Sequence, residues 1–173
     1  MKNFKQNYFI CALALVTLGA CSQQKPSDRD IARQQEISLA EVKRAELAQV
    51  EGHYQGMLYG DSGFEQSVVL SLQVRDIPQD NTGEGVDPIL IPKLVGYLRF
   101  LYGNEDLGEY SDAPIKSAEY YSNQKKLNIV VNHSQFGDLI LNLSVQDDKA
   151  NGSWGAGSVG ASGTAQFDME SGN

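Results

Sequence analysis

The spacing of apolar residues along the chain changes at Gly52. Before it, Leu39, Val42 and Leu47, with smaller alanines between them, form a narrow apolar stripe along one side of a helix. After it, apolar and polar residues alternate one by one, which is the period of a β-strand with one buried face. The alternation is clearest over residues 68–75, 127–132 and 139–146. The pattern therefore predicts a short helix followed by a series of strands.

The helix is expected over about residues 39–50. Ser38 and Glu41 have the spacing of a capping box, in which two side chains satisfy free backbone N–H groups at a helix start. Gly52 is of the residue type that commonly follows a helix end. A looser helical stretch from Ser27 onward is the alternative start. We interpret the helix as a stem or lid packed on the strands, with a partner-binding segment as the alternative.

Five weaker strand patterns complete the β region, over residues 53–60, 94–103, 115–122, 152–157 and 161–169. The segments between strands are short, and Asn151-Gly152 is the strongest two-residue hairpin signal. No helical period returns after Gly52. The sequence therefore predicts a mainly β fold of about eight antiparallel strands, as a closed barrel or a two-sheet sandwich, preceded by one short N-terminal helix.

The longest predicted loop covers residues 76–93. Within it, Asp80, Glu84 and Asp87 offer the hard oxygen ligands that Ca²⁺ takes, although their spacing differs from that of an EF-hand loop. They form a candidate calcium site, and a solvated acidic loop is the alternative.

An up-and-down arrangement of the strands would gather other acids at the two ends of the fold. Asp147 and Asp148 would share one end with the 76–93 loop. The other end would carry Asp61, Glu65, Glu105, Asp106 and Glu109.

The first twenty residues have a composition of their own. Lys2 and Lys5 precede an apolar run over residues 10–18, which is about half the roughly twenty residues needed to span a bilayer. Such a run is typical of a secretory signal peptide. The stretch Leu18-Gly19-Ala20-Cys21 resembles the lipobox of bacterial lipoproteins.

The lipobox resemblance implies cleavage before Cys21 and acylation of that cysteine, which would hold the chain on a membrane through acyl chains. Ser22 follows it in place of the aspartate that retains such proteins in the inner membrane, so we expect the outer membrane of a bacterial envelope. The chain would divide into a signal peptide (1–20), a lipidated tether and helix (21–50) and a β domain (51–173).

Cysteine content and charge limit the partners of the mature chain. Cys11 leaves with the signal and Cys21 is acylated, so no thiol remains for a disulfide or for catalysis. The net charge of the full chain is −8, and loss of two lysines with residues 1–20 takes it to −10. A chain this acidic, without a basic cluster, repels phosphate backbones, so nucleic acid is excluded as a partner class.

The pattern of candidate catalytic residues does not predict an enzyme. A zinc site would need both His53 and His133 with a carboxylate, and their positions do not suggest that they converge. No Gly-x-Ser-x-Gly elbow occurs. The glycine-rich stretch 155–160 lies among strands rather than at a helix N-terminus, where phosphate binds. Outward tyrosines such as Tyr59 and Tyr97 are a candidate platform for a sugar or a protein.

The stretch Gly52-His53-Tyr54-Gln55-Gly56, which follows the predicted helix and opens the β region, resembles the entry to a lipocalin or another calycin barrel. Tyr54 stands where that family usually has Trp. The resemblance implies a closed barrel that holds a small apolar ligand. We expect a non-enzymatic binding or accessory protein of the envelope, with protein or glycan as partner. The alternatives are a small-ligand carrier and a calcium-binding β module.

Overall fold

A computed structural model describes residues 27–61, 63–79, 88–103 and 108–170. The chain forms two compact units, Met1–Gln34 and Gln35–Asn173. The described part of the first unit begins helix α1 (Asp28–Leu47). The second unit contains the rest of α1, a 3₁₀ turn η1 (Ala48–Val50) and all of the strands.

Helix α1 begins at Asp28, so the expected start near residue 39 is wrong and the alternative start near Ser27 is correct. The Ser27 hydroxyl accepts a hydrogen bond from the Asp30 N–H at 3.2 Å, and the Asp30 carboxylate accepts one from the Ser27 N–H at 3.0 Å. These bonds form a capping box. The pKa of Asp30 is lowered because its carboxylate accepts hydrogen bonds from the Ser27 hydroxyl, at 2.7 Å, and from the Ser27 N–H. Ser38 lies inside the helix, because an earlier cap and the helix-forming residues after it extend the helix toward the N-terminus.

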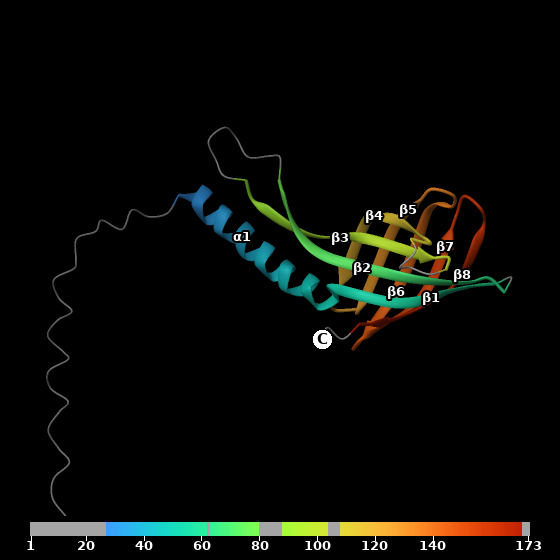
Figure 1. Cartoon of the computed structure of the whole chain (residues 1–173). Coiled ribbons are helices and arrows are strands. Elements are labelled where there is room, and N and C mark those ends of the chain that lie inside the picture. The colour runs from blue at the N-terminus through green and yellow to red at the C-terminus, as the bar shows by residue number, and fades with distance from the viewer. Residues whose placement is uncertain (1–26, 62, 80–87, 104–107, 171–173) are drawn as a thin grey trace, which may run out of the picture. The chain divides into compact units, whose positions relative to one another are not determined.

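Eight antiparallel strands form a closed barrel in sequence order, and β1 pairs with β8 to close it (Figure 1). The strands are β1 (Gly52–Gly60), β2 (Glu65–Pro78), β3 (Leu90–Leu101), β4 (Tyr110–Tyr121), β5 (Lys126–His133), β6 (Gly137–Gln146), β7 (Lys149–Ala156) and β8 (Ala161–Met169). The predicted fold class is confirmed, and of its two forms the barrel is the correct one.

Two local predictions are wrong. Asn151-Gly152 is not a turn but lies within β7, where Asn151 pairs with Ser144 on β6. The turn falls at Asp147-Asp148, where Asp147 takes the left-handed conformation (φ 52°) that aspartate tolerates better than most residues. An Asn-Gly pair is only a local preference, and the register of β6 with β7 overrides it.

The loop predicted over 76–93 is shorter, because β2 and β3 continue as a long paired hairpin (Figure 1). Asp76 pairs with Pro92 and Pro78 pairs with Leu90 in the register of these strands. Asp80, Glu84 and Asp87 lie outside the described residues. Asp76 forms an ion pair with Arg44 of α1.

The inward faces of the strands build one apolar core. On β5 and β6, Leu127 pairs with Leu143, Ile129 with Leu141 and Val131 with Leu139, and all six side chains are buried. This is the alternation read from the sequence, with each apolar position facing the barrel interior.

One end of the barrel is closed by the C-terminal part of α1 and by η1. Leu47 and Val50 are buried in the core. The hydroxyl of buried Tyr54 donates a hydrogen bond to the Val50 carbonyl at 3.0 Å, and burial raises the pKa of Tyr54 to about 12. The Val74 N–H donates to the Glu51 carboxylate at 3.0 Å. We call this the closed end. The opposite end, where the described residues 61, 63–64, 102–103, 108–109, 134–136 and 157–160 lie between the strands, is the open end.

Candidate ligand pocket

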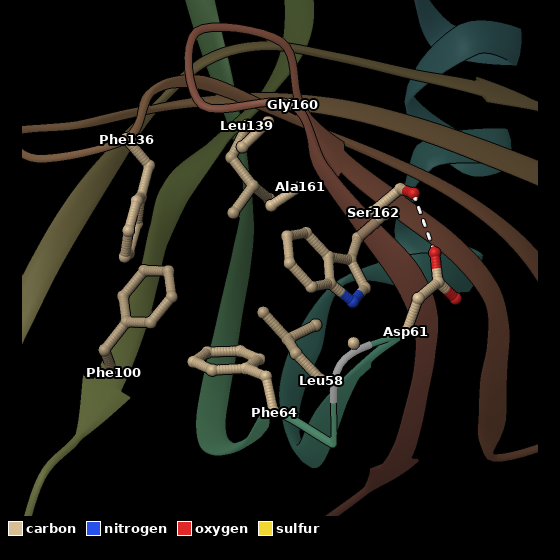
Figure 2. Close-up of a pocket in the computed structure, with 12 residues that line it drawn as sticks. Leu58, Asp61, Phe64, Phe100, Phe136, Leu139, Gly160, Ala161 and Ser162 are labelled. Atoms are coloured by element: carbon tan, nitrogen blue, oxygen red, sulfur yellow. Dashed lines mark hydrogen bonds between the residues drawn. The ribbon is translucent and has the colours of Figure 1, made fainter.

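A pocket of about 290 Å³ lies at the open end of the barrel (Figure 2). Its wall is mainly apolar and includes Leu58, Phe64, Phe100, Phe136, Leu139 and Trp154. These side chains come from β1, β3, β6, β7 and two of the connections at the open end. Pockets for small molecules are usually lined by apolar and aromatic side chains with a few polar groups at fixed places.

The side chain of Trp154 on β7 extends across the neighbouring strand β8 and reaches β1. It pairs with Gly163 on β8, and its indole N–H donates to the Tyr59 carbonyl of β1 at 3.0 Å. Gly163 has no side chain in the path of the indole, and a Cβ there would lie only 1.8 Å from the Tyr59 oxygen. The glycine therefore permits the close approach of β8 to β1, and the hydrogen bond fixes the orientation of the indole.

Phe64 forms the outer part of the wall. Its ring lies 5.9 Å from that of Trp154, at an interplanar angle of 53°. The side chain is 37% exposed, so an aromatic ring stands partly in solvent at the mouth of an apolar pocket. A backbone hydrogen bond from the Gly60 N–H to the Phe64 carbonyl, at 2.8 Å, holds the turn that positions it.

His133 supports the opposite wall. Its ring lies 4.5 Å from that of Phe100 and stacks on Phe136 at 4.6 Å. Its Nδ1 accepts hydrogen bonds from the N–H groups of Gln135 and Phe136, at 3.1 and 3.3 Å, which leaves the proton on Nε2. The side chain is 2% exposed, and burial lowers its pKa, so the imidazole is neutral at pH 7. A neutral ring between two phenyl rings keeps this wall uncharged.

The polar edge of the pocket is formed by Asp61 and Ser162, which Figure 2 shows facing each other across the β1 and β8 ends. The Ser162 hydroxyl donates to the Asp61 carboxylate at 3.2 Å. Among the described residues that line the pocket, Asp61 has the one charged side chain. Both residues are exposed and follow the outward positions of β1 and β8, so the carboxylate lies on the outer side of the rim and the interior wall of the pocket is apolar.

The residues predicted as sites from the sequence do not form this pocket. Cys21 and the candidate calcium ligands Asp80, Glu84 and Asp87 lie outside the described residues. Within the described ranges, no three histidine, cysteine or acidic side chains are grouped so that they could hold a metal ion. His53 is the second residue of β1, at the closed end, and His133 is the last residue of β5, at the open end, so the two histidines do not converge.

The tyrosine platform is also not formed by Tyr59 with Tyr97. Tyr97 of β3 pairs with Ser71 of β2, and Ser71 in turn pairs with His53 of β1. His53 lies six residues before Tyr59 on the same strand. At about 3.3 Å per residue the two rings start roughly 20 Å apart. Tyr97 instead lies 5.1 Å from the guanidinium of Arg99, which forms an ion pair with Asp112.

The sequence analysis did not single out the aromatic residues of the pocket. A signal was nevertheless present, because Phe64, Phe100, Phe136 and Trp154 all fall near strand ends that an up-and-down topology brings to one side. Comparisons with protein-family models, curated proteins and solved structures found no match to the chain. In the part of the chain that the structure describes, no helix is long and apolar enough to cross a membrane.

Proposed function

We propose that this protein binds a small, mainly apolar ligand in the pocket at the open end of the barrel, as a lipid-anchored protein of the bacterial envelope. The pocket is the observation that supports binding. Its aromatic wall leaves apolar surface in contact with water, and covering that surface with a ligand is favourable by about 25 cal/mol per Å². The anchor is proposed from the lipobox-like stretch that ends at Cys21.

The volume suits a ligand of two rings or of similar bulk. An apolar protein cavity of about 150 Å³ accommodates benzene. The present pocket, of about 290 Å³, has roughly twice that space. A binding role is favoured over a catalytic one because the indole N–H of Trp154 already donates to the Tyr59 carbonyl and the Ser162 hydroxyl to Asp61.

Trp154 supplies a test, because it is the one tryptophan of the chain. The sample is the chain from Cys21 onward with Cys21→Ser, which retains every other residue of the proposed mature protein and needs no detergent. The single indole N–H signal in an NMR spectrum is followed during titration with the neutral probe 2-naphthylmethanol. We expect a saturable shift of this signal, and native mass spectrometry of the untreated sample to reveal a small molecule that is lost on denaturation.

Matched variants assign the binding to the pocket. Phe64→Ala removes an aromatic wall and is expected to weaken probe binding about tenfold, which corresponds to about 1.4 kcal/mol. Leu90→Ala removes a comparably exposed apolar side chain from the far hairpin and should leave affinity unchanged. An indole signal that does not move at saturating probe, in a folded protein without a bound molecule, would contradict the proposal.

A further inference from the structure

The outward face of β5, β6, β7 and β8 carries a block of uncharged polar side chains, which we call the polar face. Its residues alternate along each strand with the buried apolar ones, and the strand registers place them in two adjacent rows. One row consists of Asn128, Asn142, Ser153 and Thr164, and the next of Lys126, Ser144, Asn151 and Gln166. Seven of these eight side chains end in an amide or a hydroxyl group, and Lys126 carries the one charge among them.

The amides and hydroxyls of the polar face are not engaged with the protein. Among the described residues, none of the seven side chains forms a hydrogen bond with another protein group. They lie on paired strands about 4.8 Å apart, so their spacing is set by the sheet. The polar face therefore presents several free donors and acceptors in a fixed arrangement.

Two open hollows lie along the polar face and share Asn142. The larger, of about 530 Å³, includes Tyr121, Asn128, Asn142 and Ser144. The second, of about 410 Å³, includes Asn142, Ser153 and Gly155. Together the two hollows extend over strands β4 to β8, which is room for an extended ligand rather than for a compact one.

Tyr121 adds an aromatic surface at one edge of the larger hollow. It pairs with Lys126 of the polar face, and its side chain is 41% exposed. Its hydroxyl donates to the Glu119 carboxylate at 2.5 Å, which restrains the ring and leaves its faces available. A ring of this kind offers an apolar surface on which the C–H groups of a sugar can pack.

We propose that the polar face binds a neutral oligosaccharide, with sugar hydroxyls bonded to Asn128, Asn142 and Ser153 and a sugar ring packed on Tyr121. A sugar hydroxyl both donates and accepts, as a side-chain amide does, so the two are complementary. The site lies on the outside of the barrel, and the proposal does not rest on the proposed function.

The composition of the polar face disfavours other partner classes. An acidic glycan or a nucleic acid would meet Lys126 as the one cation of the two rows, on a chain whose net charge is −8. A protein partner is usually held by large anchors buried at the centre of the contact. The centre of this face is occupied by Asn142, Ser144 and Ser153 instead.

A titration followed by NMR tests the proposal on the ¹⁵N-labelled chain from Cys21 onward with Cys21→Ser. The probes are cellohexaose and chitohexaose, which are neutral hexasaccharides, and hexagalacturonate, which is acidic and of the same length. We expect at least one neutral sugar to cause saturable shifts of the side-chain amide signals of Asn128 and Asn142. Hexagalacturonate should bind at least about tenfold more weakly, because an acidic chain repels it.

Matched variants locate the binding. Asn142→Ala removes the amide common to both hollows and is expected to weaken sugar binding about tenfold. Asn132→Ala is the control, because it removes an exposed amide from the outward side of β5 outside the two rows. Phe64→Ala, which alters the apolar pocket, should leave the affinity for the sugar unchanged.

Each of several outcomes would overturn the proposal. The first is that neither neutral sugar shifts these signals, and the second is that hexagalacturonate binds best. A third is sugar affinity that survives in Asn142→Ala or falls equally in Asn132→Ala. A fourth is that signals of the polar face shift on dilution of the protein alone, which would make the face a contact between two copies of the chain.

Discussion

At the scale of single residues, Trp154 and Gly163 depend on each other. The indole reaches the Tyr59 carbonyl only because its cross-strand neighbour on β8 is a glycine. Removal of the indole would leave the pocket without its central wall, and a side chain at Gly163 would collide with backbone rather than with a movable group.

Gly163→Val is therefore expected to lower the free energy of unfolding by about 1–3 kcal/mol, the usual cost of overpacking. The new Cβ would lie 1.8 Å from the Tyr59 oxygen, so β1 and β8 would have to separate where they close the barrel. Urea denaturation measures the change. Gly157→Ala is the control, because a Cβ at Gly157 meets no atom within 4 Å, and a similar loss in both variants would contradict the explanation.

Because His133 is buried, we expect the free energy of unfolding to depend on pH. Burial lowers its pKa in the folded chain, so below about pH 6.5 the unfolded chain binds a proton that the folded chain does not. The stabilisation from neutral His133 is complete above that pH and is lost progressively as the pH falls toward the folded-state pKa. His133→Gln cannot be protonated and should flatten the fall in stability between pH 7 and pH 5.

Thermal unfolding followed by circular dichroism across this range tests the assignment to His133. His53→Gln is the matched control, because His53 is the other histidine and is exposed at the closed end. The assignment would be refuted by a pH dependence that disappears in the His53 variant and persists in the His133 variant.

At the scale of elements, the closed end owes its form to contacts between η1 and the barrel. The chain passes from α1 through η1 directly into β1, with Leu47 and Val50 buried in the core. Lys43 donates to the Tyr120 carbonyl at 3.2 Å, and the Ser122 hydroxyl donates to Glu46 at 2.9 Å. The last turns of α1 thus cover one end of the barrel, and the apolar pocket is confined to the other.

Tyr54→Phe tests this closure. The substitution removes the hydroxyl that donates to the Val50 carbonyl and leaves a buried acceptor without its partner. We expect a loss of about 1–3 kcal/mol in the free energy of unfolding, measured in urea. Tyr121→Phe is the control, because its hydroxyl bonds to Glu119 at the exposed surface and should contribute less than about 0.5 kcal/mol. Equal losses of unfolding free energy in the two variants would show that the buried hydrogen bond from Tyr54 to Val50 does not stabilise the closed end.

At the scale of the whole molecule, the proposed lipid anchor would set where the pocket can act. Cys21→Ala should abolish acylation and release the protein from the membrane fraction of bacteria that express it, because no cysteine would remain at the cleavage site. Metabolic labelling with a palmitate analogue and cell fractionation measure both effects. Cys11→Ala is the control and should leave labelling and membrane association unchanged. Membrane association that survives in Cys21→Ala would refute the anchor.

Much of the fold followed from the sequence because its signals are local. The alternation over residues 127–132 and 139–146 predicted β5 and β6 closely, since a half-buried strand imposes a period of two on its own residues. The predictions that failed were of element ends. Where β2 and β3 end, and which residues turn between β6 and β7, depend on pairing with another strand.

By itself the sequence determined the strand count and the antiparallel β class. Only the tertiary structure decided between a barrel and a sandwich, because closure depends on the pairing of β1 with β8, which are separated by most of the domain. The same long-range pairing brings Phe64, Phe100, Phe136 and Trp154 together around one pocket. A binding site assembled from strand ends far apart in the chain leaves no contiguous motif, since each residue is chosen by its neighbours in space.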